Sequence, residues 1–150
     1  MADTLENQIN EFCNTLNSIN RVYEDFSKSV NIPYTTLEIL DVIIKKENCT
    51  QKAICEHTFL PKQTVNNVIT SFYRNGIVEL KELQWDRRNK TVHLTEKGKE
   101  FADNLMPKVR DAEYKAMKNL SAEQRDNLLK GIKDYYEMFK KAMDDNIAEK

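Results

Sequence analysis

The chain has 150 residues, 40 % of them apolar, which is enough for one domain with a buried core, alone or with an oligomerisation extension. No apolar stretch approaches the roughly twenty residues that cross a membrane, and the acidic N-terminus lacks the pattern of a signal peptide. Three cysteines make no disulfide framework, so we expect a cytoplasmic protein without a membrane partner.

Charge is distributed unevenly along the sequence. The formal net charge is −1 overall, but it is −4 over residues 1–60, +4 over residues 61–99 and −1 over residues 100–150. Salt screens phosphate attraction within about 8 Å, so the local charge matters more than the total. The middle of the chain is therefore the part that we expect to meet an anionic partner.

The first predicted element is a long helix that ends before Asn31-Ile32-Pro33. Its apolar residues recur at alternating spacings of four and three, as in helices that pack along one another. They are Leu5, Ile9, Phe12, Leu16, Ile19, Tyr23, Phe26 and Val30. One small domain cannot cover so long and narrow a seam, and we expect another helix to pack on it.

Two short helices are predicted next. Thr35 and Glu38 form a capping-box pattern that begins a helix ending near Lys46. The apolar stripe of this helix is Leu37, Leu40 and Ile44. Thr50 is placed to cap a further helix over residues 51–57.

The helix predicted over residues 61–75 has an unusual exposed face. Its buried stripe is formed by Val65, Val68, Ile69 and Phe72. The opposite face carries Gln63, Asn66, Asn67, Thr70 and Arg74. Asn and Thr are poor helix formers, and Asn and Gln pair bidentately with adenine in the major groove of DNA. We interpret this face as one that contacts bases and phosphates; the plainer alternative is a solvated surface.

A basic hairpin follows Gly76, the expected left-handed stop of that helix. The strand that begins at residue 77 leads to a tip with Arg87, Arg88 and Lys90, and Thr95 is placed to cap the next helix. A protruding tip of this kind favours DNA contact by arginine. The alternative is an exposed tip with a weak surface ion pair to Asp86, and for Trp85 we favour packing back onto the lobe over contact with the DNA backbone.

Two long helices complete the pattern. The fifth runs from Thr95 to about Leu120 and is expected to bend at Pro107. Ser121 and Gln124 form a second capping box, which opens a sixth helix. The stripe of the sixth helix is Leu128, Ile132, Tyr135, Phe139 and Met143. The first, fifth and sixth helices are longer than the compact centre needs, which predicts a dimer in which they bury one another.

The motif Asp86-x-Arg88-x-x-x-Val92-x-Leu94-Thr95-x-x-Gly98 resembles the wing signature of the multiple-antibiotic-resistance regulator (MarR) family, and Leu60-Pro61-Lys62-Gln63-Thr64-Val65-Asn66 is similar to the start of its recognition helix. The resemblance implies one domain over residues 1–150. Residues 1–32 and 100–150 would be dimerisation helices, and residues 33–99 a winged helix-turn-helix lobe with a recognition helix (61–75) and a wing (81–94). Such a homodimer binds a pseudo-palindromic DNA operator.

The resemblance also assigns roles to residues. Asp86 would orient Arg88, which would enter the minor groove. The expected DNA-contacting residues are Lys62, Gln63, Thr64, Asn66, Asn67, Thr70, Arg74, Arg87, Arg88 and Lys90. A small-molecule effector is expected to lower DNA affinity from a crevice near Tyr23, Phe26 and Tyr34, for which core packing is the alternative. No catalytic constellation or cofactor motif occurs, so we expect a repressor and not an enzyme.

Two other functions stay open. The segment Lys81-Glu82-Leu83-Gln84-Trp85 has fewer arginines than many members of the family carry there, which leaves room for a winged-helix module that binds protein and no DNA. Cys13 raises the possibility of a thiol-based oxidative-stress regulator, although we expect a packed or half-buried thiol there. Cys49, Cys55 and His57 lie close in sequence, but their spacing is poor for zinc and we expect no metal.

Overall fold

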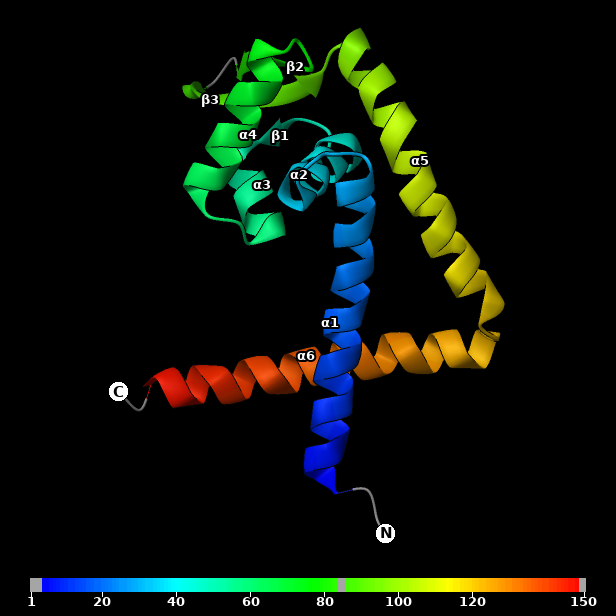
Figure 1. Ribbon diagram of the computed structural model, residues 1–150. Coiled ribbons are helices and arrows are strands. Elements are labelled where there is room, and N and C mark those ends of the chain that lie inside the picture. Colours follow the sequence, from blue (N-terminus) through cyan, green and yellow to red (C-terminus); the bar gives the residue numbers. More distant parts are fainter. Residues whose placement is uncertain (1–3, 84–85, 149–150) are drawn as a thin grey trace. The chain divides into compact units, whose positions relative to one another are not determined.

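The computed structural model describes residues 4–83 and 86–148, and of residues 86–88 it describes the backbone only (Figure 1). Over this part of the chain it has six helices and three strands. They are α1 (Leu5–Ser29), α2 (Tyr34–Lys45), β1 (Cys49–Thr50), α3 (Gln51–Thr58), α4 (Lys62–Arg74), β2 (Val78–Leu83), β3 (Asp86–Leu94), α5 (Glu96–Asn119) and α6 (Ala122–Ala148). The predicted mainly α winged-helix class is confirmed.

Two compact units divide the chain, Met1–Asn104 and Leu105–Lys150. The first contains the helix-turn-helix and the sheet, and the second contains the end of α5 and the whole of α6. Among the described residues, no helix combines the length and the apolar character needed to cross a membrane.

Helix α2 forms the centre of the first unit and contacts α1, α3, α4 and β3. Five of its side chains are buried: Leu37, Ile39, Leu40, Val42 and Ile43. The predicted stripe was too narrow, because a helix with neighbours on several sides buries more than one face. Ile44, which we expected in the stripe, is half-buried.

The predicted capping box at the start of α2 is wrong. The helix begins two residues earlier, with Pro33 and not Thr35 as its N-cap residue, and no side chain caps it. The carbonyl of Pro33 accepts hydrogen bonds from the backbone N–H groups of Thr36 and Leu37, at 2.9 and 3.3 Å. Proline fixes the extended backbone that precedes a helix, so Thr35 already lies inside the first turn, where its hydroxyl no longer acts as a cap.

The ends of α3 and α4 follow the prediction. The Thr50 hydroxyl accepts a hydrogen bond from the backbone N–H of Ala53 at 3.1 Å and so caps α3. Gly76 has φ +70°, and the N–H groups of Gly76 and Ile77 donate to the carbonyls of Tyr73 and Phe72. This pair of bonds is a Schellman motif, in which a left-handed glycine ends a helix.

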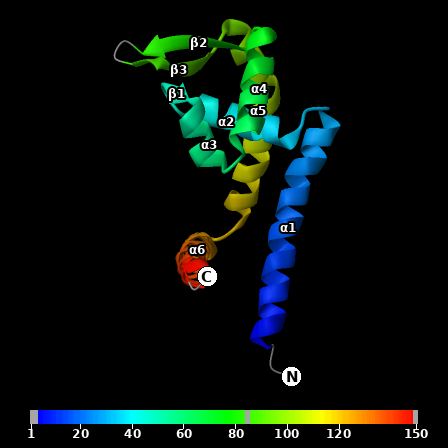
Figure 2. The ribbon, with the colours of Figure 1, turned by 90° about the vertical axis from the view of Figure 1, so that its left-hand side faces the viewer.

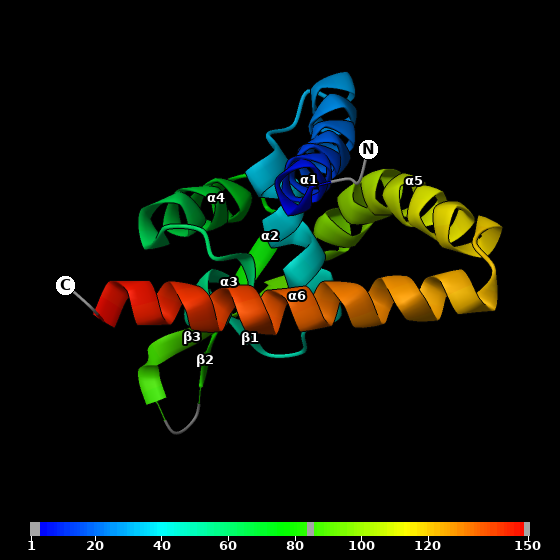
Figure 3. The same cartoon turned by 90° about the horizontal axis from the view of Figure 1, so that it is seen from below.

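The three strands form an antiparallel sheet in the order β1-β3-β2. The β2–β3 hairpin extends from the lobe as an arm (Figures 2 and 3). Glu82 pairs with Lys90, but Leu83 pairs with Asp86, so three residues of β3 between these pairs bulge out of the ladder. Two of the three are Arg87 and Arg88, which we predicted at the tip; the structure places them inside β3.

Residues of the second unit confirm the other capping box. The Gln124 side chain accepts a hydrogen bond from the backbone N–H of Ser121 at 2.8 Å, and the Ser121 hydroxyl accepts one from the N–H of Gln124 at 3.2 Å. Helix α6 begins directly after this pair, and Pro107 lies inside α5 as expected from the sequence.

Candidate nucleic-acid interface

The exposed face of α4 carries the side chains that the sequence singled out. Lys62, Gln63, Asn66, Asn67 and Arg74 are exposed, and Thr64 and Thr70 are half-buried. The buried stripe below them is Val65, Ile69 and Phe72. The face is therefore held in place by apolar packing on its reverse side, and its polar groups are open to a partner.

One amide pair on this face is already ordered. The side-chain N–H of Gln63 donates to the side-chain oxygen of Asn67 at 2.9 Å, one helical turn away. Amides three or four residues apart on a helix stabilise each other in this way. The pair presents two fixed amide groups, which reduces the conformational entropy lost when a ligand binds them.

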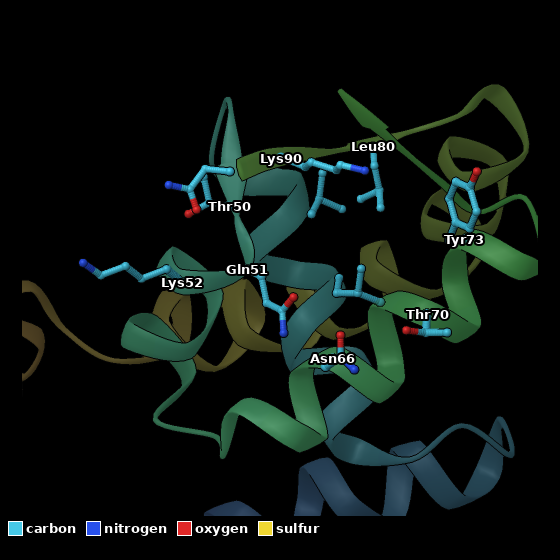
Figure 4. A pocket seen from close by; sticks show the side chains of 11 residues that line it. Thr50, Gln51, Lys52, Asn66, Thr70, Tyr73, Leu80 and Lys90 are labelled. Atoms are coloured by element: carbon cyan, nitrogen blue, oxygen red, sulfur yellow. The ribbon is translucent and has the colours of Figure 1, made fainter. Parts of the chain in front are cut away.

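A cavity of about 270 Å³ separates α4 from the hairpin. Figure 4 shows Asn66 and Thr70 of α4 on one wall and Lys90 of β3 on the wall opposite. Gln51 and Lys52, at the start of α3, close a third side. The floor is apolar and is formed by Ile69, Leu80 and Val92. Lys90, with the amides and hydroxyls around the hollow, suits an anionic ligand that accepts hydrogen bonds, whereas the ammonium group of Lys52 points away from the hollow and lies 3.8 Å from Glu56 (Figure 4).

Sequence reasoning missed four residues of this cavity: Gln51, Lys52, Tyr73 and Asn89. Their positions depend on how α3 and β3 approach α4, which no local pattern reveals. The only sequence signal for Gln51 and Lys52 was the capping residue Thr50, which marks the start of the helix before the recognition helix. The first residues of that helix lie close to the same surface.

The hairpin carries a mixed charge. Lys90 is exposed and pairs in register with Glu82, whereas the side chains of Asp86, Arg87 and Arg88 and the whole of Trp85 lie outside the described residues. A hydrogen bond from Lys81, 2.8 Å away, holds the pKa of Glu79 below its ordinary value, and the charge of Lys81 lowers it further.

The aromatic residues proposed for an effector site lie at the junction of α1 and α2. The rings of Tyr23 and Tyr34 have centroids 5.9 Å apart, and both side chains are half-buried, as is Phe26. The structure thus brings Tyr23 and Tyr34 together. Neither the cavity between α4 and the hairpin nor the shallow hollow along the first turns of α5, both lined by described residues, includes these three side chains.

The cysteines differ in exposure. Cys13 is exposed on α1, so the expectation of a packed or half-buried thiol is wrong for the single chain. The residues on either side of it along the helix, Glu11 and residues 14–20, are exposed as well. Cys49 is buried in β1, and burial raises the pKa of its thiol. Among the described residues, no group of His, Cys, Asp and Glu could hold a metal ion.

Three features define a winged helix-turn-helix fold, a class of fold that binds DNA. They are the helix α4 with its exposed amide side chains, the capped helix α3 before it and the β2–β3 hairpin beside it. The family model described as MarR family matches residues 30–89, which is most of the lobe. Over these residues the chain is similar to the MarR family of transcriptional regulators.

Known relatives cover most of the chain. The transcriptional regulator SarZ of Staphylococcus epidermidis is 24% identical over 113 residues, which are 75% of this chain and 75% of SarZ. NMB1585, a MarR family regulator from Neisseria meningitidis, superposes with a TM-score of 0.80 at 26% identity and covers 93% of this chain and 99% of its own.

Two other solved structures share the fold at lower identity. Staphylococcus aureus MarR in complex with salicylate and kanamycin has a TM-score of 0.70 at 23% identity, covering 93% of this chain and 97% of its own. Streptococcus pneumoniae FabT in complex with DNA has a TM-score of 0.69 at 21% identity, covering 90% of this chain and 97% of its own.

Proposed function

We propose that this regulator is a homodimeric repressor that binds a pseudo-palindromic operator. In each subunit α4 enters the major groove and the wing, residues 81–94, reaches the neighbouring minor groove. The observation that carries the proposal is the hollow between α4 and β3, which has polar side chains on its walls. Two elements that enter adjacent grooves must straddle the sugar-phosphate strand between the grooves, and the hollow, with Lys90, Asn66 and Thr70 on its walls, suits that strand.

The exposed amide side chains of α4 are the groups proposed to contact the bases. Gln63, Asn66 and Asn67 are exposed on α4, and amide side chains pair bidentately with adenine. We therefore expect half-sites that contain A·T pairs. Lys62, Thr64, Thr70 and Arg74 flank the amides and suit phosphate contacts, and Arg87 and Arg88, oriented by Asp86, are proposed for the minor groove.

Dimerisation is proposed for residues 1–32 and 100–150, which flank the lobe at 33–99 within a single domain. Apolar side chains of the predicted seams are exposed in the single chain: Leu5, Ile9, Leu16, Ile19, Leu128, Ile132, Tyr135, Phe139 and Met143. A stripe of this length on two helices is typical of a surface that a second copy covers.

A small-molecule effector is proposed for the junction of α1 and α2. Solved MarR family structures include one bound to salicylate and kanamycin, and Tyr23, Phe26 and Tyr34 offer half-buried aromatic surface here. A ligand would act by changing the spacing of the two recognition helices, because only one spacing fits successive grooves.

The salt dependence of DNA binding tests the proposal. We expect Lys90→Met to reduce the slope of log affinity against log salt by about one, as the loss of one phosphate contact does. Lys28→Met is the matched control, because Lys28 carries the same charge and is also exposed but lies on α1. Equal slopes for the two variants, or no DNA binding by the unmodified protein, would contradict the proposal.

A further inference from the structure

The first turn of α5 is bonded to the C-terminal end of the recognition helix. The ammonium group of Lys97 donates a hydrogen bond to the backbone carbonyl of Asn75 at 2.8 Å. The hydroxyl of Thr95 donates to the carbonyl of Gly76 at 2.5 Å. Asn75 is the C-cap of α4, where carbonyls lack partners within the helix and a positive charge is favoured.

The same turn also closes the base of the wing. Val78 and Leu94 are the last paired residues of the β2–β3 ladder, and the backbone N–H of Thr95 then donates to the carbonyl of Ile77 at 3.1 Å. The Thr95 hydroxyl in turn accepts a hydrogen bond from the N–H of Gly98 at 3.0 Å. One residue, Thr95, therefore bonds to the end of α4, the base of the wing and the start of α5.

The backbones of these elements are also in close contact around Gly98, at a junction that we call the joint (residues 75–78 and 94–98). A Cβ atom built on Gly98 would lie 1.9 Å from the carbonyl oxygen of Ile77, so the start of α5 approaches the chain between α4 and β2 more closely than any side chain allows. One turn further along α5, the ring of Phe101 packs edge-on against Phe72 of α4 with centroids 6.2 Å apart.

We propose that Thr95 and Lys97 are positioning residues: they lock the recognition helix, the wing and α5 into one unit, so that movement of α5 is transmitted to the DNA-reading surface. The inference rests on the proposed function. A helix and an arm that reach adjacent grooves need a fixed angle between them, and this joint is where their backbones meet. Neither side chain needs to touch DNA to fulfil this role.

Lys97→Met and Lys99→Met form a matched pair for the DNA-binding test. Both remove one positive charge from the same turn, but Lys99 bonds to Glu96 of its own helix and leaves α4 untouched. We expect Lys97→Met to weaken operator binding about fivefold more than Lys99→Met, with the same salt slope, and Lys97→Arg to restore most of the loss. Equal affinities of the two Met variants would overturn the proposal, as would a loss explained entirely by a smaller slope, which indicates direct phosphate contact.

A second measurement needs no DNA and separates this inference from the proposed function. Thr95→Val removes the hydrogen bonds of the Thr95 hydroxyl, to the carbonyls of Gly76 and Ile77 and from the N–H of Gly98, whereas Thr95→Ser keeps them. We expect amide hydrogen exchange at Gly76 and Ile77 to be about tenfold faster in Thr95→Val and unchanged in Thr95→Ser. If amide exchange at Gly76 and Ile77 is unchanged in Thr95→Val, the Thr95 hydroxyl does not hold the end of α4 in place, and the positioning role is refuted even if the protein binds DNA. If the unmodified protein does not bind DNA, the proposed function is refuted, and with it the role of Thr95 and Lys97 in positioning a DNA-binding surface.

Discussion

Glycines at two positions of the chain have opposite steric surroundings, although both lie in helices. Gly98 faces the carbonyl of Ile77 at a distance that excludes a Cβ atom, whereas Gly131 in α6 has nothing within 4 Å. Gly98→Ala must displace backbone and is expected to lower the free energy of unfolding by about 2–4 kcal/mol. Gly131→Ala is expected to raise it by about 0.5–1 kcal/mol through helix propensity.

Urea denaturation of the two variants measures both effects under one set of conditions. The comparison is informative because the substitution is chemically the same and only the surroundings differ. A Gly98→Ala variant as stable as the unmodified protein would mean that α5 does not approach the Ile77 carbonyl closely enough to exclude a Cβ atom.

Glu38 on α2 predicts a pH dependence of stability. Burial raises the pKa of this carboxyl above its ordinary value, so the folded state disfavours the charged form. The unfolded chain then binds fewer protons than the folded one between the two pKa values, and stability falls as the pH rises through that window. We expect Glu38→Gln to be more stable than the unmodified protein at neutral pH and equally stable below the ordinary carboxyl range.

Thermal unfolding across a pH series checks this sign. Glu137→Gln is the control, because Glu137 is exposed on α6 and carries the same chemistry. A stabilisation by Glu38→Gln that persists at acid pH would point to a packing effect and not to the burial of charge.

Secondary structure was predicted well where a local signal fixes it. Thr50, Gly76 and the pair Ser121 and Gln124 set helix ends through bonds to atoms only a few residues away, and each acts as the sequence indicates. The start of α2 was placed two residues late because Pro33 gave an equally local but stronger signal than the capping-box pattern. The burial of α2 could not be predicted, since it depends on neighbours that are distant in sequence.

The candidate interface was predictable only in part, for the same reason. The amide face of α4 is visible in the sequence because unusual residues occupy a helical periodicity. Lys52 and Gln51 line the same cavity but belong to α3, and only the tertiary arrangement brings them to it. The bonds of Lys97 and Thr95 to Asn75 and Gly76 likewise join residues some twenty positions apart.

The apolar stripe of α6 predicts how the subunits associate. No side chain of this helix is buried in the single chain, and Tyr135 stacks on Phe139 with centroids 5.6 Å apart. Ile132, 45% exposed, lies on this stripe. We expect Ile132→Asp to shift the protein from dimer towards monomer in sedimentation velocity, because a charge in a packed seam is strongly unfavourable.

Lys130→Asp provides the comparison. It introduces the same carboxylate on the polar side of α6, about half a helical turn away from Ile132. If both variants dissociate equally, general charge effects and not burial of the stripe govern association. If neither dissociates, the seam lies outside the interface.

At the scale of the whole molecule, DNA affinity and symmetry are linked. A lobe with few arginines on the ascending strand offers modest phosphate attraction, and a dimer doubles the contacts that each lobe makes. Two-fold symmetry of the protein then demands two-fold symmetry of the DNA site. The exposed thiol of Cys13 on α1 lies within the segment proposed to meet the second copy, so its accessibility depends on the same association.

Selection of bound sequences from a random pool of duplex DNA, at two salt concentrations, tests the central claim most directly. The account predicts enrichment of inverted repeats whose A·T-containing half-sites lie about 10 base pairs apart or a multiple of that, with stronger enrichment at higher salt, where non-specific binding falls away. A pool that stays random at both salt concentrations, or one that enriches a single asymmetric half-site, would contradict it.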